Sequence, residues 1–84
     1  MANADTFPLQ TLLDVLNAVR GNKGLEPLPT LERDQDLRRD LGLDSLDLAE
    51  LTVRLEAESG VDVFQAGLVA TVGEVLDRLK GRDG

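Results

Sequence analysis

The chain of 84 residues contains no cysteine and no histidine. Without cysteine it forms no disulfide and offers no thiolate nucleophile or thiolate metal ligand. Without histidine it lacks the commonest general base and the commonest transition-metal ligand, and a serine–histidine–aspartate triad is excluded. We therefore expect a protein that is not an enzyme and that holds no metal ion.

Aromatic residues and positive charges are also scarce. Phe7 and Phe64 are the only aromatic residues, too few to stack nucleic-acid bases. The nine Lys and Arg residues are outnumbered by sixteen Asp and Glu, which gives a formal net charge of −7 at pH 7. That charge disfavours contact with nucleic-acid phosphates and favours basic protein partners, so we expect no nucleic-acid partner.

Long hydrophobic runs are missing as well. No apolar run approaches the roughly 18 residues that a membrane-spanning helix needs. The first residues carry neither the basic start nor the apolar stretch of a secretory signal. We therefore expect a cytoplasmic protein with no membrane insertion. The length and a hydrophobic content of 42% predict a single domain over residues 1–84. We also expect the protein to be a monomer.

Hydrophobic spacing predicts an all-α fold. The predicted helices cover residues 8–20, 45–59, 65–69 and 72–80. The residues of the first helix that are expected to face inward are Leu9, Leu12, Leu13, Leu16 and Val19. Thr71 and Glu74 have the spacing of a capping box at the start of the last helix, which Gly73 is expected to weaken slightly. The fold class is thus a four-helix bundle with a long first loop and a short third helix.

The long first loop, residues 21–44, is rich in glycine and proline. Within it we expect a single turn that directs Leu37 and Leu41 inward. Asp34, Asp36 and Asp40 lie close together but lack the spacing of a calcium-binding loop. We interpret these three carboxylates as a solvated acidic face rather than as a site for a divalent cation.

The predicted helix at 45–59 is apolar on two sides. One face carries Leu48, Leu51, Thr52 and Leu55, and the nearly opposite face carries Leu46, Ala49 and Val53. Because a surface helix of a small bundle buries one face, we assign the leucine-rich face to the core and expect the other to be exposed. Exposed apolar side chains beside carboxylates are typical of a docking surface. The alternative is that the long loop covers both faces.

The start of this helix is the most informative part of the sequence. Ser45 follows a loop at Gly42, so its hydroxyl is expected to be exposed beside free backbone N–H groups and the positive end of the helix dipole. This setting favours a bound phosphate. The competing interpretation is that Ser45 is an ordinary N-cap, but Asp44 and Asp47 are better placed to cap the helix.

The run Asp40-Leu41-Gly42-Leu43-Asp44-Ser45-Leu46-Asp47-Leu48-Ala49-Glu50-Leu51 resembles the modification site of acyl carrier proteins. The resemblance extends over about residues 9–80. It implies that Ser45 carries 4′-phosphopantetheine and that Asp44 and Leu46 flank the arm as cofactor-binding residues. It further implies that the protein carries acyl intermediates as thioesters and shuttles them between the enzymes of a fatty-acid-like or specialised pathway.

The resemblance also implies partners: a phosphopantetheinyl transferase, and acyl-loading and acyl-processing enzymes with basic docking patches. The residues expected to meet them are Asp44, Leu46, Asp47, Glu50, Val53 and Glu56. Departures from the fatty-acid carrier pattern, among them Ser59 and Phe64, favour a specialised, free-standing member of the family. The open alternatives are an aryl, aminoacyl or polyketide cargo, and an unmodified helical adaptor in which Ser45 is only a cap.

Overall fold

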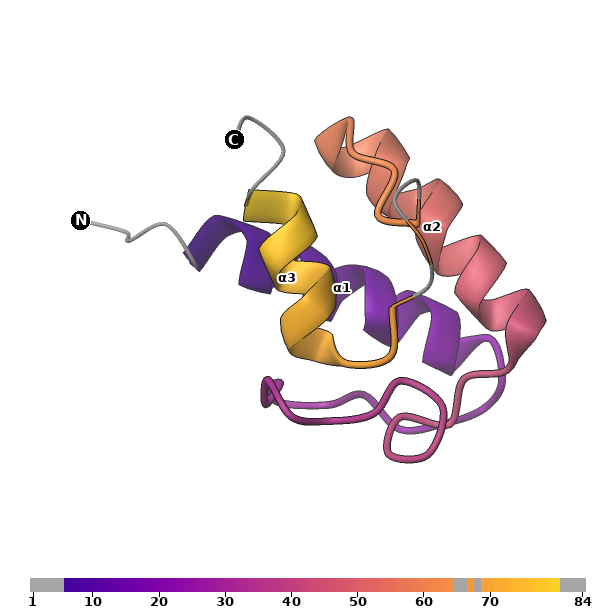
Figure 1. Ribbon diagram of the computed structural model, residues 1–84. Coiled ribbons are helices and arrows are strands. Elements are labelled where there is room, and N and C mark those ends of the chain that lie inside the picture. The colour runs from indigo at the N-terminus through magenta and orange to yellow at the C-terminus, as the bar shows by residue number, and fades with distance from the viewer. Residues whose placement is uncertain (1–5, 65–66, 68, 81–84) are drawn as a thin grey trace.

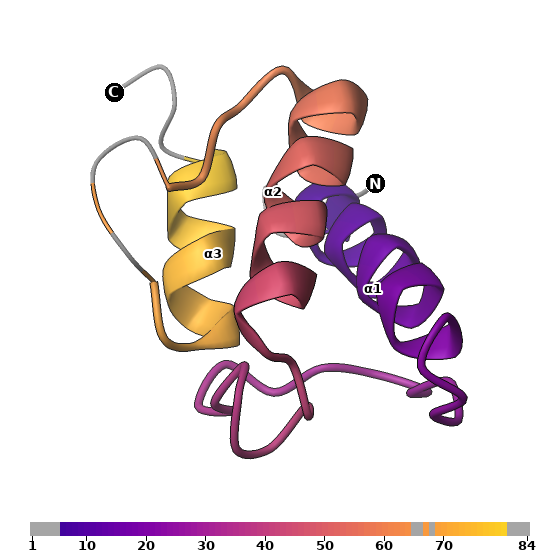
Figure 2. The ribbon, with the colours of Figure 1, turned by 90° about the vertical axis from the view of Figure 1, so that its right-hand side faces the viewer.

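The computed structural model describes residues 6–64, 67 and 69–80, and Figure 1 shows their path. These residues contain three α-helices: α1 (Thr6–Gly21), α2 (Ser45–Ser59) and α3 (Val72–Lys80). Helix α1 packs against both α2 and α3. Figures 1 and 2 place the first turns of α2 and α3 at the same end of the molecule, beside the long first loop. None of the three helices is long and apolar enough to cross a bilayer.

The helix bounds follow the sequence pattern closely. Helices α2 and α3 coincide with the predicted ranges, while α1 begins two residues earlier and ends one residue later than residues 8–20. Pro8 is therefore the third residue of α1, where the missing N–H costs no intrahelical hydrogen bond. Of the predicted short helix at 65–69, residues 65, 66 and 68 lie outside the described part of the chain, and the two described residues, Gly67 with a φ of +126° and Val69, are not helical.

Leucine and valine side chains from all three helices and from the loops form the core. Its members are Leu12, Val15, Leu16, Val19, Leu31, Leu37, Leu41, Leu43, Leu51, Leu55, Val63, Val69, Val72, Val75, Leu76 and Leu79. Two predicted core residues of α1, Leu9 and Leu13, lie half-buried at the edge instead, and Val15 is buried in their place. The buried face of α1 is thus rotated slightly about the helix axis relative to the predicted face, because this helix packs against both α2 and α3.

Asp36 and Asp40, two of the three carboxylates that the sequence brings close together in the first loop, accept hydrogen bonds within a tight turn. The carboxylate of Asp36 accepts the backbone N–H groups of Arg38 at 2.9 Å and of Arg39 at 2.8 Å. These two hydrogen bonds hold the pKa of Asp36 below its ordinary value, and the bond from the N–H of Arg39 has the larger effect. The carboxylate of Asp40 accepts the N–H of Asp36 at 2.6 Å. Leu41, at the end of the turn, is buried as predicted. No group of three acidic, His or Cys residues within the described ranges is placed to hold a metal ion.

The first loop also contacts the start of α3 through its backbone. An isolated antiparallel bridge joins Asp36 to Thr71, and the N–H of Gly73 donates to the carbonyl of Arg33 at 2.9 Å. A Cβ atom on Gly73 would lie 3.0 Å from that carbonyl oxygen. Gly73 therefore has a role beyond the predicted slight weakening of the helix, since a residue without a side chain lets the loop backbone lie close to a first-turn N–H group.

Candidate functional site

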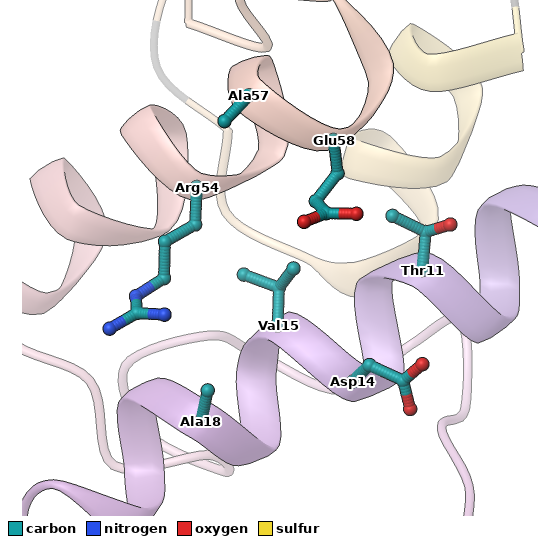
Figure 3. A pocket seen from close by; sticks show the side chains of 7 residues that line it. All are labelled: Thr11, Asp14, Val15, Ala18, Arg54, Ala57 and Glu58. Carbon is teal, nitrogen blue, oxygen red and sulfur yellow. The ribbon is translucent and has the colours of Figure 1, made fainter.

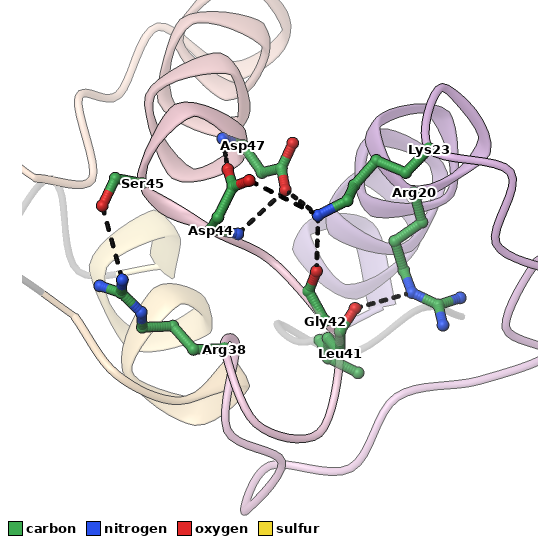
Figure 4. Close-up of polar contacts among 8 residues, drawn as sticks. All are labelled: Arg20, Lys23, Arg38, Leu41, Gly42, Asp44, Ser45 and Asp47. Atoms are coloured by element: carbon green, nitrogen blue, oxygen red, sulfur yellow. Dashed lines mark hydrogen bonds and ion pairs between the residues drawn. The ribbon is translucent and has the colours of Figure 1, made fainter.

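Ser45 is the first residue of α2, and its side chain is exposed. The chain turns into the helix at Gly42, whose φ of +76° lies in the left-handed region that favours glycine. Asp44 then adopts an extended conformation as the N-cap. This local path presents the Ser45 hydroxyl outward at the N-terminal end of α2, as the sequence predicts (Figure 4).

The cap of α2 is a reciprocal pair of carboxylates. Asp44 Oδ1 accepts the N–H of Asp47 at 2.9 Å, and Asp47 Oδ2 accepts the N–H of Asp44 at 2.9 Å. The prediction that these residues, and not Ser45, cap the helix is confirmed. The first intrahelical bond runs from the N–H of Leu48 to Asp44 O at 2.9 Å. The N–H groups of Ser45 and Leu46 therefore precede the hydrogen-bonded ladder and point toward the region before the helix.

Lys23, in the turn that follows α1, holds the start of α2 in place. Its Nζ lies 2.6 Å from Asp47 Oδ2, 2.9 Å from the carbonyl oxygen of Gly42 and 3.8 Å from Asp44 Oδ2 (Figure 4). The hydrogen bond with Lys23, followed by that from the N–H of Asp44, lowers the pKa of Asp47. The same contact raises the pKa of Lys23. Only 13% of the Asp47 side chain is exposed.

Two other cations of this region face different groups. Arg20 Nε donates to the carbonyl of Leu41 at 3.0 Å and its guanidinium also contacts the carbonyl of Glu26, so it secures the loop. Arg38 Nη2 lies 3.5 Å from Ser45 Oγ, at the outer limit of a hydrogen bond. Sequence reasoning missed Lys23 and Arg38 because no periodic pattern fixes the direction of a side chain in an irregular segment.

The two-sided character of α2 is confirmed. Leu51 and Leu55 are fully buried, whereas Leu46 and Val53 are 82% and 66% exposed. Ala49, between them, is exposed too. The alternative in which the long loop covers both faces was wrong, because the loop passes the N-terminal end of the helix and leaves its outer face open (Figure 2). We call Leu46, Ala49 and Val53 the apolar strip.

The predicted partner-binding carboxylates differ in their surroundings. Asp44 and Glu56 are exposed. Glu50 Oε2 pairs with Arg54 Nε at 2.9 Å and accepts from Asn22 Nδ2 at 3.4 Å. The Asp47 carboxylate pairs with Lys23 and accepts the N–H of Asp44 within the helix cap. Helical spacing places Glu50 beside the apolar strip, since it lies four residues after Leu46 and three before Val53.

A small hollow lies on the other side of Ser45. Its volume is about 270 Å³, and it is lined by Asp36, Arg38, Leu48, Val69, Ala70 and Glu74. Leu48 lies three residues after Ser45, so both are on one side of α2. Arg38 is thus shared between the hollow and the Ser45 hydroxyl.

An open groove of about 460 Å³ runs between α1 and the second half of α2 (Figure 3). Its lining residues are Thr11, Asp14, Val15, Ala18, Arg54, Ala57 and Glu58. Its lining carries two carboxylates, Asp14 and Glu58, against one guanidinium, Arg54. It is lined by the part of α2 farthest along the chain from Ser45.

Comparison with known proteins bears directly on the Ser45 region. The family model described as "Phosphopantetheine attachment site" matches residues 10–79. The acyl carrier protein of Saccharopolyspora erythraea is 47% identical over 53 residues, which cover 61% of this chain and 56% of that protein. Acyl carrier protein 3 of Ralstonia nicotianae is 34% identical over 67 residues, covering 80% and 76%.

A third similar protein is the mitochondrial acyl carrier protein of Saccharomyces cerevisiae, 34% identical over 70 residues that cover 81% of this chain and 56% of that protein. The matched segment thus spans little more than half the length of the S. erythraea and yeast relatives.

Proposed function

Since the chain belongs to the family of the phosphopantetheine attachment site, whose members carry that group covalently, we propose that it is an acyl carrier protein modified on Ser45. This family consists of carriers rather than catalysts. The observation that carries the proposal is the exposed Ser45 hydroxyl at the start of α2, within the matched residues and not engaged in the helix cap.

The residues around Ser45 fit a phosphodiester. The N–H groups of Ser45 and Leu46 and the positive end of the α2 dipole favour an anion at this point. Arg38 adds a positive charge beside the hydroxyl. Asp44 and Leu46, the chain neighbours of Ser45, would flank the point of attachment.

The chain contributes an acceptor hydroxyl to the modification and leaves the proton transfer to the transferase. Arg38 is the described side chain that contacts Ser45 Oγ, and an arginine stays protonated and takes up no proton. The neighbouring carboxylate of Asp44 is occupied by the N–H of Asp47. Once attached, the arm supplies a thiol on which acyl groups are held as thioesters.

Partner enzymes would dock on the outer face of α2. Leu46 and Val53 provide an exposed apolar centre, and the carboxylates of Asp44, Asp47, Glu50 and Glu56 provide negative charge around it. Asp47 contributes its negative charge without direct contact, because its Oδ2 accepts from both Lys23 and the N–H of Asp44 and only 13% of the side chain is exposed. A face of this kind suits transient complexes with basic patches, whose association weakens as salt is added.

The wider proposals follow from the same family membership. We propose a single domain that works as a monomer in the cytoplasm. The cargo is a fatty-acid-like or other acyl chain of a specialised pathway; aryl, aminoacyl and polyketide cargoes are the alternatives.

The proposal is tested by intact mass after incubation with coenzyme A, Mg²⁺ and a promiscuous phosphopantetheinyl transferase. The parent protein should gain one phosphopantetheine and Ser45→Ala none. Ser59→Ala is the matched control, since that hydroxyl donates to the carbonyl of Leu55 at 2.6 Å at the far end of α2, and it should be modified like the parent. No gain on folded, unmodified parent protein would leave the unmodified adaptor as the better account.

A further inference from the structure

We propose that Arg38 binds the phosphate that joins the arm to Ser45 and thereby sets the side of α2 on which the arm leaves. The inference rests on the proposed attachment at Ser45. It concerns a side chain of the first loop, outside the helix that carries the modification motif.

The position of the guanidinium suggests the contact. Arg38 Nη2 lies 3.5 Å from Ser45 Oγ before any phosphate is attached (Figure 4). In the modified protein the phosphorus is bonded to that oxygen, so the two unesterified phosphate oxygens lie one bond farther out. A guanidinium presents its N–H groups as a planar fork that matches such a pair of oxygens.

Arg38 is available for this contact, whereas its neighbours are engaged. Lys23 is paired with Asp47. Arg39 lies 3.8 Å from Asp36 Oδ2 with 85% of its side chain exposed. Among the carboxylates that the structure describes, none lies within 4.0 Å of the Arg38 guanidinium. The backbone of Arg38 is nevertheless fixed, because its N–H donates to Asp36 Oδ1 at 2.9 Å.

The positive charge of Arg38 would reduce electrostatic repulsion around the attached phosphate. The chain already carries a formal net charge of −7, and the phosphodiester adds a further negative charge next to the exposed carboxylate of Asp44. Repulsion between these groups would push the phosphate away from the helix end. A guanidinium on the opposite side of the serine offsets that repulsion at short range.

The same contact gives the arm a direction. Arg38 lines the 270 Å³ hollow together with the apolar Leu48 and Val69 and the carboxylates of Asp36 and Glu74, on the side of α2 away from the apolar strip. A phosphate bound to Arg38 therefore places the first atoms of the arm over the hollow. Leu46 and Val53 then stay uncovered for a partner enzyme.

The test follows the arginine side chains by NMR in protein labelled with ¹⁵N-arginine, before and after modification. The Arg38 Nε–Hε signal, identified by its loss in Arg38→Lys, should move downfield more than that of Arg39. In Arg38→Ala the ³¹P signal of the modified protein should shift toward that of the same phosphodiester in urea-unfolded protein. It should stay in place in Arg39→Ala, which removes the same charge one residue away.

Complete modification by mass, with the Arg38 signal unmoved and the ³¹P signal equal in Arg38→Ala and the parent, would overturn the Arg38 contact and leave attachment at Ser45 intact. No mass gain on any of these proteins would overturn both. Arg38 is exposed, so both of its variants are expected to fold, and their amide spectra check this directly.

Discussion

Asp44 combines a structural and an electrostatic role that substitution can separate. Its carboxylate caps α2 through the N–H of Asp47 and also adds negative charge beside Ser45. Asp44→Ala removes both, and loss of an N-cap costs about 1 kcal/mol. Asp44→Asn keeps a capping oxygen and removes the charge. We expect urea unfolding to show the loss for Asp44→Ala only.

The two variants should behave alike toward the transferase, because both remove one charge from the surface it meets. Association rates measured at low salt should fall to a similar extent for Asp44→Ala and Asp44→Asn, and the difference from the parent should shrink at high salt. Equal stability losses in the two variants would show that the charge of Asp44, and not its capping geometry, stabilises α2.

At the scale of single residues, the sequence identified the groups that a local motif fixes. Ser45, Asp44 and Asp47 lie within four consecutive residues whose backbone is set by a turn and a cap, so their relation is readable along the chain. Lys23 and Arg38 reach the same place from the first loop. The positions of these two side chains depend on how the loop packs against the helices, which no local sequence pattern predicts.

Helix α2 carries side chains for docking on one face and side chains that stabilise the fold on the opposite face. Leu46→Ala removes a side chain that is 82% exposed, so the free energy of unfolding should change by less than about 0.5 kcal/mol. Its binding to a partner enzyme should weaken roughly tenfold, as for an apolar contact at the centre of an interface. Isothermal titration at fixed salt measures this.

Leu55→Ala is the matched substitution on the opposite face of the same helix. Leu55 is fully buried, and we expect a loss of about 2–5 kcal/mol in unfolding free energy. If Leu46→Ala left partner binding unchanged on folded, modified protein, the apolar strip would not be the docking face.

Helix periodicity predicted elements better than it predicted their contacts. The two faces of α2 and the bounds of α2 and α3 follow from spacing and caps. Gly73 shows what helical spacing does not predict. Helix propensity counts this residue as a weakness, whereas its N–H also donates to the carbonyl of Arg33 at 2.9 Å, and a Cβ atom there would lie 3.0 Å from that oxygen. Contacts between a loop and a helix end depend on distances that no helical period encodes.

For the whole molecule, acid should weaken the fold through carboxylates that are hydrogen-bonded in the folded state. The contact with Lys23 lowers the pKa of Asp47 from 3.8, and the N–H groups of Ala70 and Thr71 lower that of Glu74 from 4.5. A carboxyl with a lowered folded pKa contributes stability above its unfolded value, which is lost as the pH falls through the folded one.

Urea unfolding between pH 7 and pH 3 should therefore show a falling free energy of unfolding at the acid end. Asp47→Asn removes one of these carboxyls, so the free energy of unfolding of this variant should fall less steeply with pH than that of the parent. Loss of net charge on the way to the isoelectric point near 4.3 acts in the opposite direction, and it acts on both proteins. Parallel curves for the parent and Asp47→Asn would contradict the contribution assigned to Asp47.

The all-helical architecture was predictable because leucine and valine recur at helical spacing in a chain with few competing signals. The path of the first loop was not: it contributes Leu31, Leu37, Leu41 and Leu43 to the core, and it joins the segment before α3 through the bridge between Asp36 and Thr71. Such pairing between distant segments is set by tertiary packing, which overrides local preference.

The most direct test of the account is fragment-ion mass spectrometry of the intact, modified protein. Backbone cleavage on either side of residue 45 would assign the added phosphopantetheine to one side chain. The account predicts that the added mass appears in fragments that contain Ser45 and is absent from those ending at Asp44 or beginning at Leu46. Added mass on Thr52, Ser59 or any other hydroxyl would contradict it.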